Sequence, residues 1–170
     1  MQSNSVKKLC IAGVLVALGV VCSAFYIPVG VSKCFPVQHM VNVVAGVLLG
    51  PAYACAMAFV TSLIRVMMGT GSFLAFPGSM IGAVCCGLGY KWTRRLPVAY
   101  FGEIVGTGVL GGMACWPVAT YLMGKEAALF TYVPAFLLST GVGATISILA
   151  IGALQRTHLL GQVQASLGGR

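Results

Sequence analysis

Apolar residues form six long runs along this chain, and short polar or Gly/Pro-rich stretches separate them. The runs occupy residues 9–27, 37–49, 52–68, 78–92, 98–123 and 129–154. A straight helix needs about 20 apolar residues to cross a bilayer. The pattern therefore predicts an all-α fold, a bundle of six transmembrane helices that forms a single membrane domain over residues 1–170.

The second and third runs are short, and Gly50-Pro51 lies between them. Glycine commonly ends a helix, and proline suits the first helical turn. Two helices are therefore expected here. The alternative is one kinked helix over residues 37–68, which leaves five spans.

Positive charge favours six spans. With the N-terminus inside, six spans place most of the Lys and Arg residues in the cytoplasm, including the basic turn KWTRR at 91–95. Five spans would put that turn outside, against the positive-inside tendency. We therefore predict that both termini are cytoplasmic and that three loops face outward, at about 28–36, 69–77 and 124–128.

Composition agrees with a membrane protein. Hydrophobic residues make up 59% of the chain and charged residues only 7%, whereas soluble domains are about 25% charged. The net charge of +8 comes from cations at the ends of apolar runs, a placement that marks membrane topology and not a nucleic-acid surface. The N-terminal run is expected to be a retained helix and not a signal peptide, and the tail from Gly161 to Arg170 is expected to be frayed.

The stretch LIRVMMGTGSFLAFPGSMIGA, residues 63–83, holds the strongest candidate site. Arg65 ends one apolar run, and an ionisable side chain in a membrane segment indicates function by default. Its guanidinium would bind an anion, pair with a glutamate or donate hydrogen bonds to a ligand. Thr70 and Ser72 add hydroxyl groups and Phe76 an aromatic wall, a mixture that suits a small heteroaromatic ligand.

Three polar residues open the second run. Gln38, His39 and Asn42 lie three or four positions apart and share one helix face. Such a cluster in an apolar helix predicts a cavity lining. Trp116, near the outer end of the fifth run, either closes the pocket or anchors the membrane interface.

Glu103 lies early in the fifth run, about one turn inside the cytoplasmic edge of the predicted helix. A buried glutamate must pair or be protonated, so we expect a polar lock or a partner contact at the inner face. Glycines follow it in the same run and allow close helix packing. Gly13 and Ala17 give the first run a small-residue face of the same kind.

Catalytic and metal-binding patterns are absent from the sequence. It contains no HExxH, no GxSxG, no CxxC and no phosphate-binding loop. The chain is therefore expected to be neither an enzyme nor a metal protein, to hold no cofactor and to hydrolyse no ATP.

Two segments carry a family resemblance: PVQHMVNVVAGVLLGPAYA at 36–54 and AFVTSLIRVMMGTGSFLAFPGSMIGA at 58–83. Together with GEIVGTG at 102–108, they resemble the ThiW family over about residues 9–155. ThiW proteins are substrate-binding S components of energy-coupling factor (ECF) vitamin transporters, assigned to hydroxyethylthiazole, the thiazole moiety of thiamine. The resemblance implies a multi-pass protein of a bacterial plasma membrane that binds its ligand near the outer face.

The resemblance also implies partners. An S component docks on a transmembrane T component that two cytoplasmic ATPase subunits drive, so ATP is used by the partners. Docking would involve the first helix, at Gly13 and Ala17, and the loop from Pro28 to Pro36 would act as a lid. The expected substrate-binding residues are Gln38, His39, Asn42, Arg65, Thr70, Ser72, Phe76 and Trp116. Phe76 or Trp116 would stack on the thiazole ring.

Three alternatives stay open at this point. The first is an S component for thiamine itself. The second is a membrane scaffold or assembly protein without a small ligand. The third is a stand-alone secondary transporter, which would need no ATPase partner.

Overall fold

The computed structural model describes residues 2–29 and 32–168, and it confirms an all-α membrane bundle. The only strands in the described residues are the two short ones of a hairpin, β1 (Ile27–Val29) and β2 (Ser32–Cys34). The principal helices are α1 (Gln2–Val21), α2 (Pro36–Leu48), α3 (Pro51–Met67), α4 (Ala75–Thr93) and α7 (Val133–Arg156). A further continuous helical segment comprises α5 (Leu96–Glu103), η2 (Ile104–Gly111), α6 (Gly112–Pro117) and η3 (Val118–Leu122).

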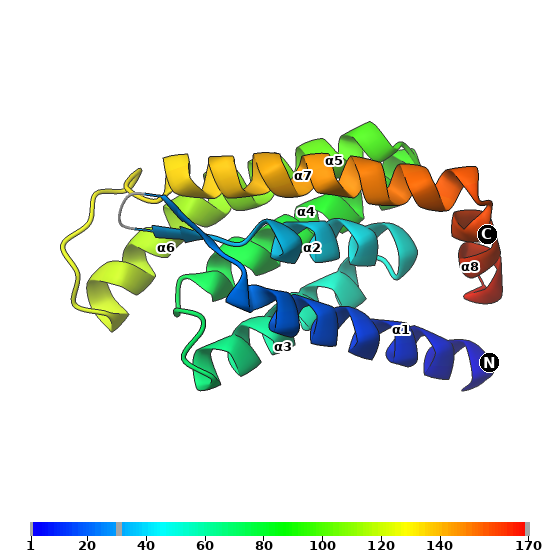
Figure 1. Cartoon of the computed structure of the whole chain (residues 1–170). Helices are drawn as coiled ribbons and strands as arrows, with labels where there is room; N and C mark the ends of the chain where they lie inside the picture. Colours follow the sequence, from blue (N-terminus) through cyan, green and yellow to red (C-terminus); the bar gives the residue numbers. More distant parts are fainter. Residues whose placement is uncertain (1, 30–31, 169–170) are drawn as a thin grey trace.

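Proline and glycine set many of the helix boundaries. A proline lies in the first turn of α2, α3, α5 and α7, where its missing N–H would have no intrahelical partner. Gly50, with φ +88°, separates α2 from α3. The chain reverses direction there (Figure 1), so the kinked five-span alternative is wrong.

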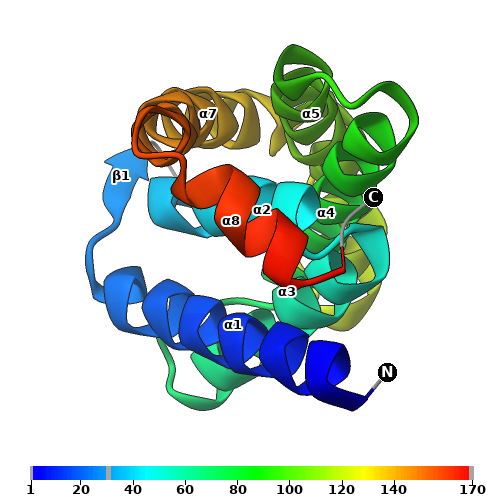
Figure 2. The same ribbon diagram turned by 90° about the vertical axis from the view of Figure 1, so that its right-hand side faces the viewer.

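Helix α2 lies at the centre of the bundle. It contacts α1, α3, α4, α5 and α7, and Figure 2 shows these helices around it. Helix α1 is peripheral, because it packs mainly on α3 and α2 and most of its span faces outward. The membrane-length apolar segments are Asn4–Ala24, Leu96–Leu122 and Val133–Arg156, whereas α2 and α3 are shorter apolar helices.

The segment from Leu96 to Leu122 packs very closely on its neighbours. A Cβ atom on Gly106 would lie 2.9 Å from the Cα of Gly82, and one on Gly111 would lie 2.7 Å from the Cα of Gly78. Only glycine permits such an approach, as expected for small residues between membrane helices. Both η2 and η3 are π-helical, a wider winding that often occurs at functional sites.

The two termini lie at the same end of the bundle (Figure 1). The hairpin β1–β2, the α3–α4 loop and the segment 123–132 gather at the opposite end. Gly30 and Val31, within the predicted lid loop, lie outside the described residues.

The prediction of a frayed tail is wrong over most of its length. Residues Leu159–Ser166 form a helix, α8, that packs on α7 and α2. Leu160 and Leu167 are buried, and the Gln164 side chain donates hydrogen bonds to the Val47 carbonyl and the Tyr90 hydroxyl. Burial of two leucines and two tertiary hydrogen bonds explains why this polar-looking tail is ordered.

Candidate functional site: a polar cavity at the loop end

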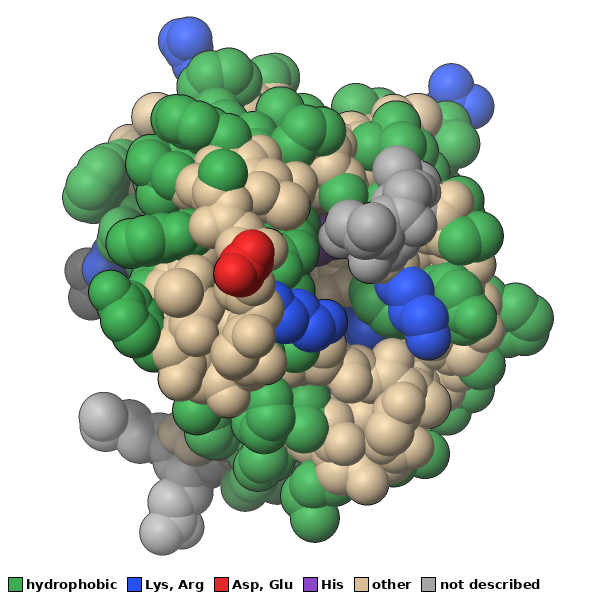
Figure 3. Space-filling view, turned by 90° about the vertical axis from the view of Figure 1, so that its left-hand side faces the viewer, with side chains coloured by type: hydrophobic (Ala, Val, Ile, Leu, Met, Phe, Trp, Pro, Cys, Tyr) green, Lys and Arg blue, Asp and Glu red, His purple; other side chains and the backbone are tan. Residues whose placement is uncertain are grey.

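A cavity of about 710 Å³ opens at the loop end of the bundle. Figure 3 looks onto this end and shows a hollow with Lys and Arg side chains beside it. The walls come from β2, the first turn of α2, the end of α3, the α3–α4 loop, the start of α4, the segment 123–132 and the start of α7. A cavity of this size suits a small organic molecule.

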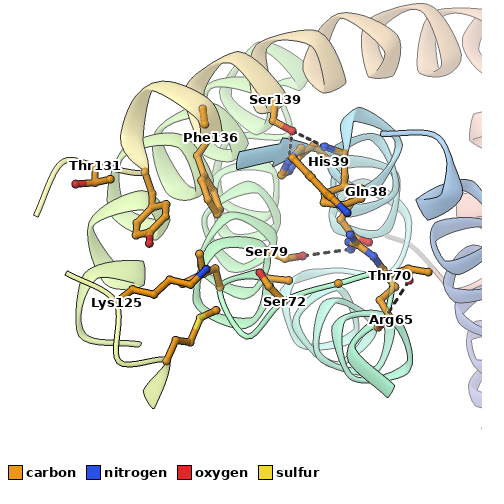
Figure 4. Close-up of a pocket in the computed structure, with 18 of the residues that line it drawn as sticks. Gln38, His39, Arg65, Thr70, Ser72, Ser79, Lys125, Thr131, Phe136 and Ser139 are labelled. Carbon is orange, nitrogen blue, oxygen red and sulfur yellow. Dashed lines mark hydrogen bonds between the residues drawn. The ribbon is translucent and has the colours of Figure 1, made fainter. Parts of the chain in front are cut away.

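The structure brings five of the eight predicted substrate-binding residues to the cavity wall. These are Gln38, His39, Arg65, Thr70 and Ser72 (Figure 4). Asn42 is fully buried one turn further along α2, and it contacts the side chains of the cavity floor without lining the cavity.

Phe76 and Trp116 do not line the cavity. The ring of Phe76 packs against Phe59 and Phe73, with centroid separations of 5.5 and 6.5 Å. Trp116 packs edge-on against Tyr121. Neither ring is therefore placed to stack on a ligand in the cavity.

Arg65 is the most unusual side chain of the wall. It is 1% exposed, and its guanidinium lies 3.8 Å from the centroid of the Phe35 ring. Nε and Nη2 have no hydrogen-bond partner, and no ion pair forms to Arg65 among the described residues. A cation–π contact recovers only part of the hydration energy of a buried guanidinium.

The α3–α4 loop holds the backbone of Arg65 in place. The amide groups of Thr70 and Gly71 donate to the Arg65 carbonyl at 2.9 and 3.0 Å, and the Thr70 hydroxyl donates to the same oxygen. Gly69 makes the turn possible with φ +71°. The polar loop GTGS therefore caps α3 and fixes the position of Arg65 at the same time.

A network of hydrogen bonds forms the cavity floor. Gln38 Nε2 donates to Ser79 Oγ at 3.2 Å, and Asn42 Nδ2 lies 3.2 Å from the same oxygen. His39 Nε2 lies 3.0 Å from Ser139 Oγ, and Nδ1 lies 3.0 Å from Glu103 Oε1. The floor is thus fixed by side chains from α2, α4, α5 and α7.

Glu103 lies at the centre of this network and not at the inner edge of the bundle. Its side chain is fully buried, and Oε1 accepts hydrogen bonds from Asn42 Nδ2 and Thr107 Oγ1 in addition to its contact with His39. The prediction of an inner-face partner contact is therefore wrong, and the polar-lock alternative fits. Glu103 is the eighth residue of a helical segment that begins at Leu96, so it lies about 10 Å along that segment.

Sequence analysis missed more than half of the wall. The missed residues include an aromatic set at the starts of α2 and α7: Phe35, Tyr132 and Phe136. They also include Lys33, Lys125 and Glu126 at the mouth and Ser139 at the floor. Ser139 could have been found from the sequence, because the pair Ser139-Thr140 interrupts the apolar run that forms α7.

The cavity wall combines charged, hydroxyl and aromatic side chains. It carries three cations, Lys33, Arg65 and Lys125, against one carboxylate, Glu126. Hydroxyl groups and aromatic rings make up much of the remainder, and no cluster of metal-ligating side chains occurs among the described residues. This arrangement can hold a small ring through stacking and hydrogen bonds.

Gly13 and Ala17 lie elsewhere, on α1. Both are exposed, and a Cβ atom added to Gly13 would meet nothing within 4 Å. The small-residue face of α1 is therefore unoccupied in this chain.

Comparison with known proteins identifies the family. The family model described as thiamine-precursor transporter protein (ThiW) matches residues 9–157. No curated protein and no solved structure matches the chain. The family match covers most of the sequence, including α2, the α3–α4 loop and α7, all of which contribute to the cavity or its floor. The chain belongs to the ThiW family of thiamine-precursor transporters.

Proposed function

We propose that this chain is the substrate-capture (S) component of an ECF-type importer for hydroxyethylthiazole or a closely related thiamine precursor. The observation that carries the proposal is the one-ended cavity of about 710 Å³, closed beneath by the network around His39 and Glu103. Below that network, α2 continues into a packed cluster that includes Val43, Val47 and Ile151. A cavity with such a floor suits capture from one side and not free passage.

Delivery inward then requires movement of the whole subunit and an external source of energy. The sequence contains no ATP-binding motif, which supports dependence on a separate ATPase module. The exposed small-residue face at Gly13 and Ala17 on α1 supports docking on a transmembrane partner, because small residues permit close helix approach. We propose that this partner is the T component, bound to two cytoplasmic ATPase subunits.

The aromatic wall offers a place for the thiazole ring. The cavity is lined by Phe35, which follows the hairpin, and by Phe136, which belongs to α7. Tyr132 lines the same wall and lies four residues before Phe136. In this proposal the ring packs between these side chains. Ser72, which lines the cavity and is exposed, would hydrogen-bond the ligand hydroxyl.

Calorimetry on the purified protein in detergent tests capture. Hydroxyethylthiazole, thiamine and hydroxymethylpyrimidine would be titrated separately. Saturable binding of the thiazole supports the proposal, and binding of thiamine alone would keep the class but change the substrate. If none binds to well-folded protein, the capture function is refuted and a scaffold role is favoured.

Assembly is tested on α1. Gly13→Leu and Ala17→Leu should abolish co-purification with the T component and ATPase subunits, because a large side chain prevents close helix approach. Ligand binding should be unchanged. Gly152→Leu on α7, another glycine with nothing within 4 Å of an added Cβ atom, is the matched control and should assemble normally.

A further inference from the structure

The charges of the cavity are unevenly distributed. Lys33, Lys125 and Glu126 lie at the mouth and are exposed to solvent, which screens them. Arg65 lies in the wall and is buried. The electrostatic character of the interior therefore depends mainly on one guanidinium.

No acidic side chain neutralises that guanidinium. The chain has two acidic residues, Glu103 and Glu126. Glu103 Oε1 already contacts His39, Asn42 and Thr107 at 3.0–3.1 Å. Among the described residues, no carboxylate oxygen lies within ion-pair distance of Arg65. Arg65 is thus a buried cation without a counter-charge, a state that is strongly unfavourable unless a ligand supplies one.

The Arg65 side chain is also fixed in position from two sides. Phe35 covers one face of the guanidinium, and the α3–α4 loop fixes the backbone below it. A Cβ atom on Gly71 would lie 3.1 Å from Arg65 Cβ, so the loop closes directly on the arginine stem. Nε and Nη2, the two donors on one edge, are fully buried and have no partner. A ligand in the cavity would reach this edge only after a shift of the neighbouring side chains. Two parallel donors on one edge match the two oxygens of a carboxylate or phosphate group.

We propose that this cavity recognises its ligand through an acidic group, so that the preferred substrate is a small heteroaromatic ring bearing a carboxylate or phosphate monoester that pairs with Arg65. The inference rests on the proposed function, since it specifies the charge of the ligand for the same cavity. It also implies discrimination against a permanently cationic ring such as thiamine. Two like charges repel more strongly when protein partly encloses them than they do in water.

The proposal is tested by measuring the affinity of ligands of different charge for the wild-type protein and for variants of Arg65. Hydroxyethylthiazole phosphate, 4-methylthiazole-5-carboxylate, neutral hydroxyethylthiazole and thiamine would be titrated into the purified protein by calorimetry. Charge-assisted hydrogen bonds to the guanidinium should make at least one of the two anions about 10- to 100-fold tighter than the neutral alcohol. The two anions distinguish a carboxylate from a phosphate site.

Variants then locate the effect. Arg65→Gln should bring the ratio of anion to neutral affinity close to one and change the affinity for the neutral alcohol much less. Arg65→Lys keeps the charge but loses the planar pair of donors, so it should give an intermediate ratio. Arg156→Gln, which removes an exposed arginine at the end of α7, is the matched control and should keep the wild-type ratio.

The outcomes separate the two proposals. If the neutral alcohol or thiamine binds the wild-type protein as tightly as both anions, the charge inference is overturned while the capture function stands. If no ring compound binds to folded protein, both are overturned. If Arg65→Gln does not fold, the wild-type ratio and the ratio in Arg65→Lys decide the question.

Discussion

Replacing Glu103 by glutamine tests whether the buried network maintains the cavity floor. Glutamine keeps the volume of the side chain and one carbonyl oxygen, but it removes the negative charge that Oε1 presents to His39, Asn42 and Thr107. The new NH₂ group would replace Oε2, which has no partner in this structure. We therefore expect the variant to fold with a weakened floor and one unpaired buried donor.

The magnitude follows from three contacts of 3.0–3.1 Å. A hydrogen bond to a charged group contributes about 1.5–3 kcal/mol and a neutral one about 0.5–1.5 kcal/mol. The loss of charge would then cost about 1 kcal/mol per contact. Polar contacts between membrane helices average only about 0.6 kcal/mol, which lowers the total. We expect Glu103→Gln to reduce the free energy of unfolding by about 2–3 kcal/mol.

Reversible unfolding with SDS in mixed micelles, followed by circular dichroism, measures this loss. The matched control is Glu126→Gln, which makes the same chemical change at an exposed site on the cavity mouth and should shift stability by no more than about 0.5 kcal/mol. A double-mutant cycle with Asn42→Ala should give a coupling energy of about 0.6–1.7 kcal/mol. Equal stability of the two glutamine variants, or zero coupling, would refute the role assigned to the network.

Two further substitutions probe the cavity wall and floor. A methyl group on Gly78 would collide with the Phe136 ring, so Gly78→Ala should weaken ligand binding by about tenfold or destabilise the protein by about 1–3 kcal/mol. Calorimetry measures the first effect and SDS unfolding the second. Gly141→Ala, with open space around the added methyl group, should change neither quantity. Asn42→Ala removes the amide that lies 3.2 Å from Ser79 Oγ. The floor should loosen and the affinity for the ligand should fall several-fold, although Asn42 does not line the cavity. Unchanged affinity would show that the floor does not position the wall.

Much of the fold could be predicted because it depends on local signals. Apolar runs of membrane length, the Gly50-Pro51 break and the positive charges led to the helices and to a common end for the outward loops. The hairpin β1–β2 was missed because its pattern spans only a few residues. The C-terminal helix α8 was missed because its order depends on tertiary contacts of Leu160, Leu167 and Gln164, which no local pattern reveals.

The site was predictable where polar residues interrupt an apolar helix or follow it directly. Gln38, His39 and Arg65 are of this kind, and all three line the cavity. The aromatic residues were not predictable in this way, because an aromatic side chain in a membrane helix faces lipid, a neighbouring helix or a cavity with no difference in sequence pattern. Phe76 was chosen and Phe136 missed for that reason, since only packing decides which ring turns inward.

The separation of Arg65 from Glu103 explains why the site suits binding more than proton or ion conduction. Sequence analysis allowed the arginine to pair with a glutamate, and such a pair would have satisfied both groups at once. In the structure, Glu103 instead lies in the floor network and contacts His39, whereas Arg65 stays in the wall without a carboxylate partner. The acidic member therefore stabilises the protein, and the basic member remains available to a ligand. Below the floor, the cluster that packs α2 on α4, α5 and α7 is largely apolar and includes Val43, Val47, Ala99 and Ile151. This division of roles between the two charged groups agrees with the proposed capture function.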